Sequence, residues 1–183
     1  MKSEGVLGAA IMDLVILKKI EIIKHRIKNI ETTFMGDPYL DGVLSIMSEL
    51  KPNKKISYYF GKLLKRAKYL LPFFSEHLES LQLMNLSVKR VRLMFHFTVT
   101  NFNNELREEI INKLKDVLLQ NKNISDKTFM YFISILRATS LYKDIFGKEH
   151  KKQVKSRMKE LSIDEPIGKI VHQAVFAPEA DIL

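Results

Sequence analysis

The stretch SDKTFMYFISILRATSLYKDIF, residues 125–146, decides the fold. Between Phe129 and Leu136 it is apolar on nearly every side, whereas a helix at a protein surface carries its apolar side chains on a single stripe. A helix that is apolar all round has to be enclosed by other elements. We therefore place this segment at the centre of the fold and expect the rest of the chain to pack around it.

Further helices are predicted by apolar residues at helical spacing. They cover 6–17, a run from Pro38 to before Lys51, 56–84, 103–120, 148–161, and a last helix from Pro166 to near Ala177. In 56–84 we expect Pro72 to place a break or kink between two helices, because proline disrupts a helix interior. The predicted inward-facing residues after this point are Phe74, Leu78 and Leu81, then Leu106, Ile110, Leu114 and Leu118. Asn85 is expected to end the helix in a left-handed conformation.

Two segments predict β-hairpins. In 20–31, β-branched isoleucines flank His25-Arg26, and in 86–100 polar and apolar residues alternate with Lys89-Arg90 near the tip. The alternation places Leu93, Phe95, Phe97 and Val99 on one face of the second hairpin.

The sequence FMGDPYLDGVLSIM, residues 34–47, contains a sharp corner. Asp37 is expected to cap the following helix and Pro38 to occupy its first position. Its inward stripe is Leu40, Val43, Leu44 and Met47. Asp37 and Asp41 lie one turn apart, so a cation site or an acid–base pair is the alternative; helix capping is the stronger interpretation.

Composition limits the class of protein. The chain has 183 residues, 46% of them hydrophobic, which predicts one domain over 1–183. The fold class that follows is mainly α, a single-domain helical bundle around a central apolar helix with two small β-hairpins. The absence of cysteine excludes disulfides and thiolate chemistry and fits a cytoplasmic protein. The most apolar stretch, 5–17, is too short to span a membrane and carries Asp13.

No catalytic or metal-binding motif is present. The five histidines form no close pair and no HExxH, and the seven glycines form neither a dinucleotide-binding motif nor a P-loop. We therefore predict no enzymatic activity, no catalytic residues, no metal and no cofactor.

The formal net charge of +9 predicts attraction to polyanions. Basic residues cluster at 62–68, 89–92 and 148–157, and the second cluster surrounds Val91 at the predicted hairpin tip. A basic hairpin with an apolar tip suits an anionic membrane, where each Lys or Arg contributes about 1 kcal/mol. The predicted lipid-binding residues are Lys65, Arg66, Lys68, Lys89, Arg90 and Arg92, with Val91 contacting the membrane. The alternatives are a merely solvated charged surface and a winged-helix-like nucleic-acid binder.

The order of these segments resembles the Golgi phosphoprotein 3 family over roughly 5–176, as a divergent member with a short N-terminus. The segments that carry the resemblance are GVLGAAIMDLVILKKIEI (5–22), GDPYLDGVL (36–44), LSVKRVRLMFHF (86–97), NNELREEIINKLKDVLL (103–119) and SDKTFMYFISILRATSLYKDIF (125–146).

The resemblance implies a protein that attaches to membranes from the side. Family members bind phosphatidylinositol 4-phosphate and, in eukaryotes, hold glycosyltransferases in the Golgi by their cytosolic tails. The implied partners are an anionic phospholipid surface, phosphoinositides included, the tails of membrane proteins, and a second copy of the chain through hairpin 86–99. The implied location is cytoplasmic and peripheral to a membrane, which in a eukaryote is the cytosolic face of the Golgi.

The chain departs from the family at the headgroup pocket. The family uses a tryptophan before its first helix, and this chain has none. Leu7 stands where the family has an arginine, and Leu71 and Phe74 stand near the positions of two more. We therefore expect charge-driven attraction to anionic lipid rather than recognition of one headgroup.

Overall fold

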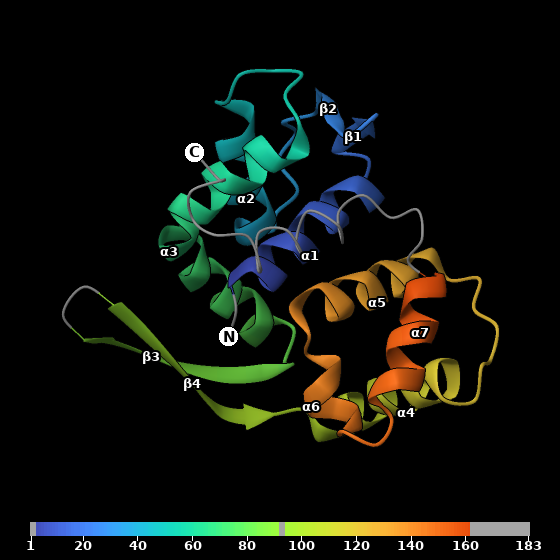
Figure 1. Cartoon of the computed structure of the whole chain (residues 1–183). Coiled ribbons are helices and arrows are strands. Elements are labelled where there is room, and N and C mark those ends of the chain that lie inside the picture. Colours follow the sequence, from blue (N-terminus) through green and yellow to red (C-terminus); the bar gives the residue numbers. More distant parts are fainter. Residues whose placement is uncertain (1–2, 92–93, 162–183) are drawn as a thin grey trace.

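The computed structural model in Figure 1 describes residues 3–91 and 94–161, with the side chains of 3, 85–100 and 102 outside the description. The described elements are α1 (Ser3–Ile16), β1 (Ile20–Ile23), β2 (Arg26–Ile30), α2 (Pro38–Ser48), α3 (Ile56–Ser80), β3 (Met84–Val91), β4 (Met94–Phe102), α4 (Asn104–Leu118), α5 (Lys127–Thr139), α6 (Tyr142–Phe146) and α7 (Lys151–Leu161). The prediction of a mainly α fold is confirmed. The helix predicted from Pro166 to Ala177 lies outside the described residues.

The N-terminal half packs α1, α2 and α3 against each other, with the β1–β2 hairpin beside them (Figure 1). The first hairpin is confirmed as an antiparallel pair, with Ile20 opposite Ile30. Its turn is formed by Lys24 and His25, at φ angles of 50° and 60°, so the turn lies one residue earlier than predicted. Two successive left-handed residues are what a tight hairpin turn requires.

The corner at Gly36 begins α2 as predicted. The side chain of Asp37 accepts hydrogen bonds from the backbone N–H groups of Tyr39 and Leu40, at 2.9 and 3.1 Å, and Pro38 is the first helical residue. The predicted inward stripe is buried throughout: Leu40, Val43, Leu44 and Met47.

The prediction of two separate helices on either side of Pro72 is wrong, because α3 runs through this residue as one helix of 25 residues; a kink at Pro72 stays a prediction. Proline removes one backbone donor, but packing on both sides compensates: Leu70 is buried before it, and Phe74 packs against Tyr39 after it, with ring centroids 5.1 Å apart. Phe74 and Leu78 are half-buried, whereas Leu81 is 52% exposed and was wrongly predicted to face inward.

The end of α3 also differs from the prediction. Gln82, at φ 54°, takes the left-handed conformation expected of Asn85, and Asn85 belongs to β3. The helix therefore ends about one turn earlier. The second hairpin is confirmed as antiparallel β3–β4, with Val91 opposite Met94 at its described end. The predicted faces of Leu93, Phe95, Phe97 and Val99 lie outside the described side chains.

The C-terminal half consists of α4 to α7. Asn103 caps α4 by accepting a hydrogen bond from the N–H of Leu106, at the start of the helix predicted over 103–120. Leu114 and Leu118 are buried as predicted, but Ile110 is 37% exposed. The first half of α4 therefore extends beyond the core that encloses its second half.

Helix α5 lies between two hydrophobic cores, which confirms the prediction of a central apolar helix. Ile135 and Ala138 pack with α1, α2 and α3, whereas Phe129, Ile133 and Leu136 pack with α4, α6 and α7. Figure 1 shows α5 between α1 on one side and α7 on the other. The single-domain prediction is untested and stays a prediction.

Candidate functional site

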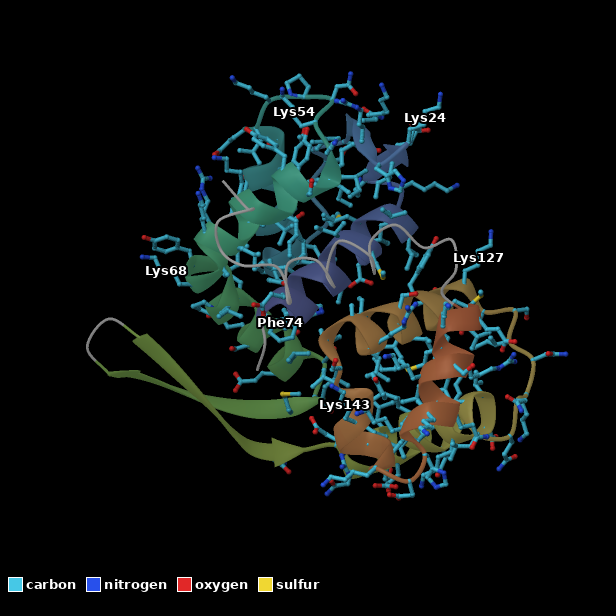
Figure 2. The ribbon with its side chains drawn as sticks, in the orientation of Figure 1. Lys24, Lys54, Lys68, Phe74, Lys127 and Lys143 are labelled. Carbon is cyan, nitrogen blue, oxygen red and sulfur yellow. The ribbon has the colours of Figure 1, made fainter. Side chains whose placement is uncertain are left out.

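The side of α3 that faces solvent carries the first predicted basic cluster. Tyr59, Phe60, Leu63 and Leu70 bury the opposite side of the helix in the core. A helix that is fixed on one side must present the residues between them outward. The residues exposed in this way are Lys62, Lys65, Arg66, Lys68 and Tyr69. Lys68 projects away from the ribbon in Figure 2.

The charges of this cluster differ in their surroundings. Arg66 forms an ion pair with Glu49 of the α2 C-cap, with Nη1 and Oε2 3.1 Å apart, and both side chains are exposed. Among the described residues no carboxylate lies within ion-pair distance of Lys62, Lys65 or Lys68. The cationic centre of the cluster is therefore formed by the three lysines, and only two of them are among the predicted residues.

Two of these lysines lie beside aromatic rings. The Lys68 ammonium is 4.8 Å from the centroid of the Tyr69 ring, and the Lys62 ammonium is 5.7 Å from that of Tyr58. A cation over an aromatic face is attracted by the ring quadrupole. Tyr69 is itself 62% exposed, and sequence reasoning missed it. The available signal was its spacing of four residues from Lys65 and seven from Lys62, which places all three on one side of a helix.

The second predicted cluster lies on the β3–β4 hairpin. Lys89 pairs with His96 and Arg90 with Phe95 in the backbone register, close to the tip; Arg92 lies outside the described residues. The base of the hairpin contacts the end of α3, and the hairpin extends away from the body on the same side as the outward face of α3 (Figure 1). The backbone thus places the two clusters on the same side of the molecule (Figure 1).

The positions matching the family's headgroup arginines belong to packed apolar structure. Leu7 is buried, Leu71 is half-buried, and Phe74 packs on Tyr39. Close by, Nδ1 of His77 lies 3.2 Å from Oδ2 of Asp37. This corner therefore places apolar side chains where the predicted phosphate-binding arginines would stand, and its basic group, His77, already lies beside Asp37.

Acidic groups at this corner influence one another. The pKa of Asp13 in α1 is raised, chiefly by desolvation and further by the Asp37 carboxylate, while His77 opposes the shift. Burial also raises the pKa of Tyr39, whose hydroxyl donates a hydrogen bond to the carbonyl of Val6. Sequence reasoning noticed Asp13 only as a charge in an apolar stretch.

The alternative role for Asp37 and Asp41 finds no support in their geometry. Both carboxylates accept backbone hydrogen bonds, those of Asp41 from the N–H groups of Met35 and Gly36 at 2.9 and 3.1 Å. Each oxygen that makes these bonds is used to hold the corner. Within residues 3–91 and 94–161, no group of three or more His, Asp or Glu side chains is arranged to hold a metal ion.

An apolar cavity of about 300 Å³ opens where the end of α3 meets the first half of α4. Its lining includes Leu78, Leu83, Ile110 and Phe132, together with Arg107. The cavity explains why Ile110 is not enclosed by the core. Sequence reasoning missed this cavity, because helical spacing alone does not show where a helix extends beyond the elements that pack against it.

No helix in the described part of the chain is long and apolar enough to cross a membrane. The class defined by the fold is a mainly α bundle that carries a projecting hairpin. The family model of Golgi phosphoprotein 3 (GPP34) matches residues 3–177. The chain belongs to this family, as the order of its segments predicted. The comparison with curated proteins gives no match.

Proposed function

We propose that this protein is a non-catalytic peripheral membrane adaptor that binds anionic phospholipid through the lysines of α3 and the β3–β4 hairpin. The observation that carries the proposal is the set Lys62, Lys65 and Lys68, which lie exposed and without a nearby carboxylate among the described residues, on the side from which the hairpin projects. Membership of the GPP34 family and a net charge of +9 support it.

The physical basis is electrostatic. A lysine near an anionic bilayer contributes about 1 kcal/mol, and three lysines on one helix act on the same surface. Arg66 contributes less to the local positive charge, because Glu49 lies beside it. We infer a preference for anionic over neutral membranes, with little choice between headgroups, since Leu7 and Phe74 fill the corner where the family's arginines would stand.

The proposal includes two protein partners that the family resemblance implies. One is the cytosolic tail of a membrane protein, which the bound adaptor would retain. The other is a second copy of the chain, through hairpin 86–99. Sedimentation equilibrium of the wild type, and of a chain in which a two-residue turn replaces 87–98, tests the second; a monomer at all concentrations contradicts it.

Vesicle co-sedimentation tests the lipid proposal. The three vesicle sets are neutral, phosphatidylserine-containing, and phosphatidylinositol 4-phosphate-containing at matched charge, each at low and high salt. We expect similar binding to both anionic sets, weakened by salt, and none to neutral vesicles. A phosphoinositide preference that survives high salt contradicts the lack of headgroup choice and makes Arg66, Lys68 and Arg90 the first residues to substitute. Absence of binding to every set overturns the proposal.

A pair of charge-matched variants locates the binding surface. Replacing Lys62, Lys65 and Lys68 by Gln should weaken binding at low salt by up to about a hundredfold. The control replaces Lys151, Lys152 and Lys155 of α7, which are also exposed and lie on the far side of the molecule from α3 (Figure 1). Both variants lose three positive charges. Equal losses in the two variants mean that net charge, not this surface, drives binding.

A further inference from the structure

The outward side of α3 carries large aromatic side chains as well as lysines. Tyr69 is 62% exposed and Phe73 is 43% exposed. Steps of four, three, four and four residues bring five side chains to one side of a helix. We call this set the α3 outer face; its members are Lys62, Lys65, Tyr69 and Phe73, which are exposed, and Tyr58, which is half-buried at the edge of the core.

We propose that the α3 outer face lies in the interfacial layer of the bilayer, with the rings of Tyr69 and Phe73 inserted among the lipid headgroups. This inference rests on the proposed function and extends it from electrostatic attraction to insertion. It assigns the membrane contact to two residues that carry no charge.

The chemistry of the α3 outer face matches that layer. Tyrosine concentrates at membrane–water interfaces, because its ring is apolar and its hydroxyl is wet, and phenylalanine is typical of the apolar side of helices that lie in that layer. Lysines beside them can bury their methylene stems and keep the ammonium at the level of the phosphates. The Lys68 ammonium, 4.8 Å from the Tyr69 ring, lies beside the ring as this arrangement requires.

The helix is already held in the orientation that insertion needs. Its inner side is fixed by Tyr59, Phe60 and Leu63, which are buried almost completely. Insertion of the outer side therefore requires no unfolding and no rotation of α3. Among the described residues, Glu49 is already paired with Arg66, and Glu76 follows Phe73 by about one turn.

The β3–β4 hairpin is a second element that would contact the same membrane as the α3 outer face. The β3–β4 hairpin follows α3 directly and projects on the same side, where Figure 2 shows Lys68 pointing outward. A membrane at this side meets both the hairpin and the α3 outer face. We therefore take the binding partner of this side to be an anionic bilayer, because its charge and polarity fit both the hairpin and the α3 outer face.

A single tryptophan reports insertion directly. The chain has none, so Tyr69→Trp introduces a unique emission signal. The matched control is Leu17→Trp: Leu17 is 51% exposed and follows the C-terminal end of α1, outside the α3 outer face. With phosphatidylserine vesicles we expect a blue shift and quenching by brominated acyl chains for Tyr69→Trp, and neither for Leu17→Trp.

A neutral double variant tests the contribution to binding. Replacing Tyr69 and Phe73 by Ser leaves the net charge unchanged, and we expect it to reduce the binding that remains at high salt by on the order of tenfold. The lysine-to-glutamine variant should instead lose binding mainly at low salt. Far-UV circular dichroism checks that both variants keep the helical content of the wild type.

The outcomes separate the two proposals. Wild-type binding together with an unshifted, unquenched Tyr69→Trp overturns insertion and leaves charge-driven binding in place. Unchanged high-salt binding of the double serine variant also overturns it. If the wild type binds no vesicle, the proposed function and this inference both fail.

Discussion

At the residue scale, the corner at 36–41 shows how two carboxylates are committed to structure. Asp37 holds the first backbone N–H groups of α2, and Asp41 reaches back to those of Met35 and Gly36. Gly36 has a φ of 81°, a conformation that a side chain would strain. Gly36 therefore permits the turn, and the two carboxylates hold the backbone on either side of it. These structural roles explain the residues at this corner without any catalytic role.

Asp37→Ala tests the cap. We expect it to lower the free energy of unfolding by about 0.5–2 kcal/mol, because two backbone donors lose their acceptor. Urea unfolding followed by circular dichroism measures the change. The control is Asp37→Asn, whose amide oxygen still accepts both hydrogen bonds. If the Asn variant loses as much stability as the Ala variant, the charge facing His77 matters more than the cap.

Asp13→Asn tests the electrostatics of the same corner. The pKa of Asp13 is raised in the folded state, so the folded protein binds a proton more tightly there than the unfolded chain does. Its contribution to stability is present below pH 3.8, the ordinary value, and is lost as the pH rises through the raised pKa.

Asp13→Asn should therefore stabilise the protein at pH 7 and make little difference near pH 3. Thermal unfolding of the variant and the wild type at both pH values measures this. A stability difference that does not change with pH contradicts it. His77→Gln in the Asp13→Asn background is the control, because the opposing effect of His77 needs the Asp13 charge.

At the scale of elements, α1 and α5 approach each other closely through Gly5. A Cβ built on Gly5 would lie 3.0 Å from Cγ2 of Thr139. Thr139 is buried, and its hydroxyl donates to the carbonyl oxygens of Ile135 and Leu136, so the side chain is held in place. The distance between the two helices is set by the absence of one methyl group.

Gly5→Ala should lower the free energy of unfolding by about 1 kcal/mol through overpacking, despite the better helix propensity of alanine. Adding Thr139→Ser removes Cγ2 and keeps the hydroxyl, so the double variant should recover most of the loss. Thermal unfolding of the four proteins completes a double-mutant cycle. Additive effects of the two changes show that the methyl contact does not set the packing.

At the scale of the whole molecule, α5 joins the two hydrophobic cores. Its residues alternate between them over fewer than three turns, so neither core is complete without this helix. We therefore expect the described part of the chain to unfold as one cooperative unit, and the single domain over 1–183 stays a prediction.

Leu44→Ala and Leu118→Ala test whether the two cores unfold together, because Leu44 lies in one core and Leu118 in the other. Each should cost about 2–5 kcal/mol, since both side chains are buried almost completely. We expect one urea transition in either variant, with the same midpoint by circular dichroism and by tyrosine fluorescence. Two separated transitions, with hydrogen exchange increased only around the altered core, show that the halves unfold independently.

The sequence could predict those features that depend on nearby residues. The caps at Asp37 and Asn103, the buried stripe of α2 and both hairpins follow from spacing and turn chemistry within a few residues. The prediction failed at Pro72, Leu81 and Ile110, where local structure and burial depend on elements that are distant in the sequence. Packing of Phe74 on Tyr39 carries α3 through its proline, and nothing in the described structure encloses Leu81 or Ile110 completely.

The sequence by itself determined the local elements, the apolar centre at 125–146, the positive charge and the family, because these depend on composition, order and short-range spacing. The tertiary structure decided which surface is available for binding. It pairs Arg66 with Glu49, 17 residues away, and it covers one side of α3 with α1 and α2. The opposite side remains exposed, and there lysines and aromatic rings meet because the core fixes the rotation of the helix.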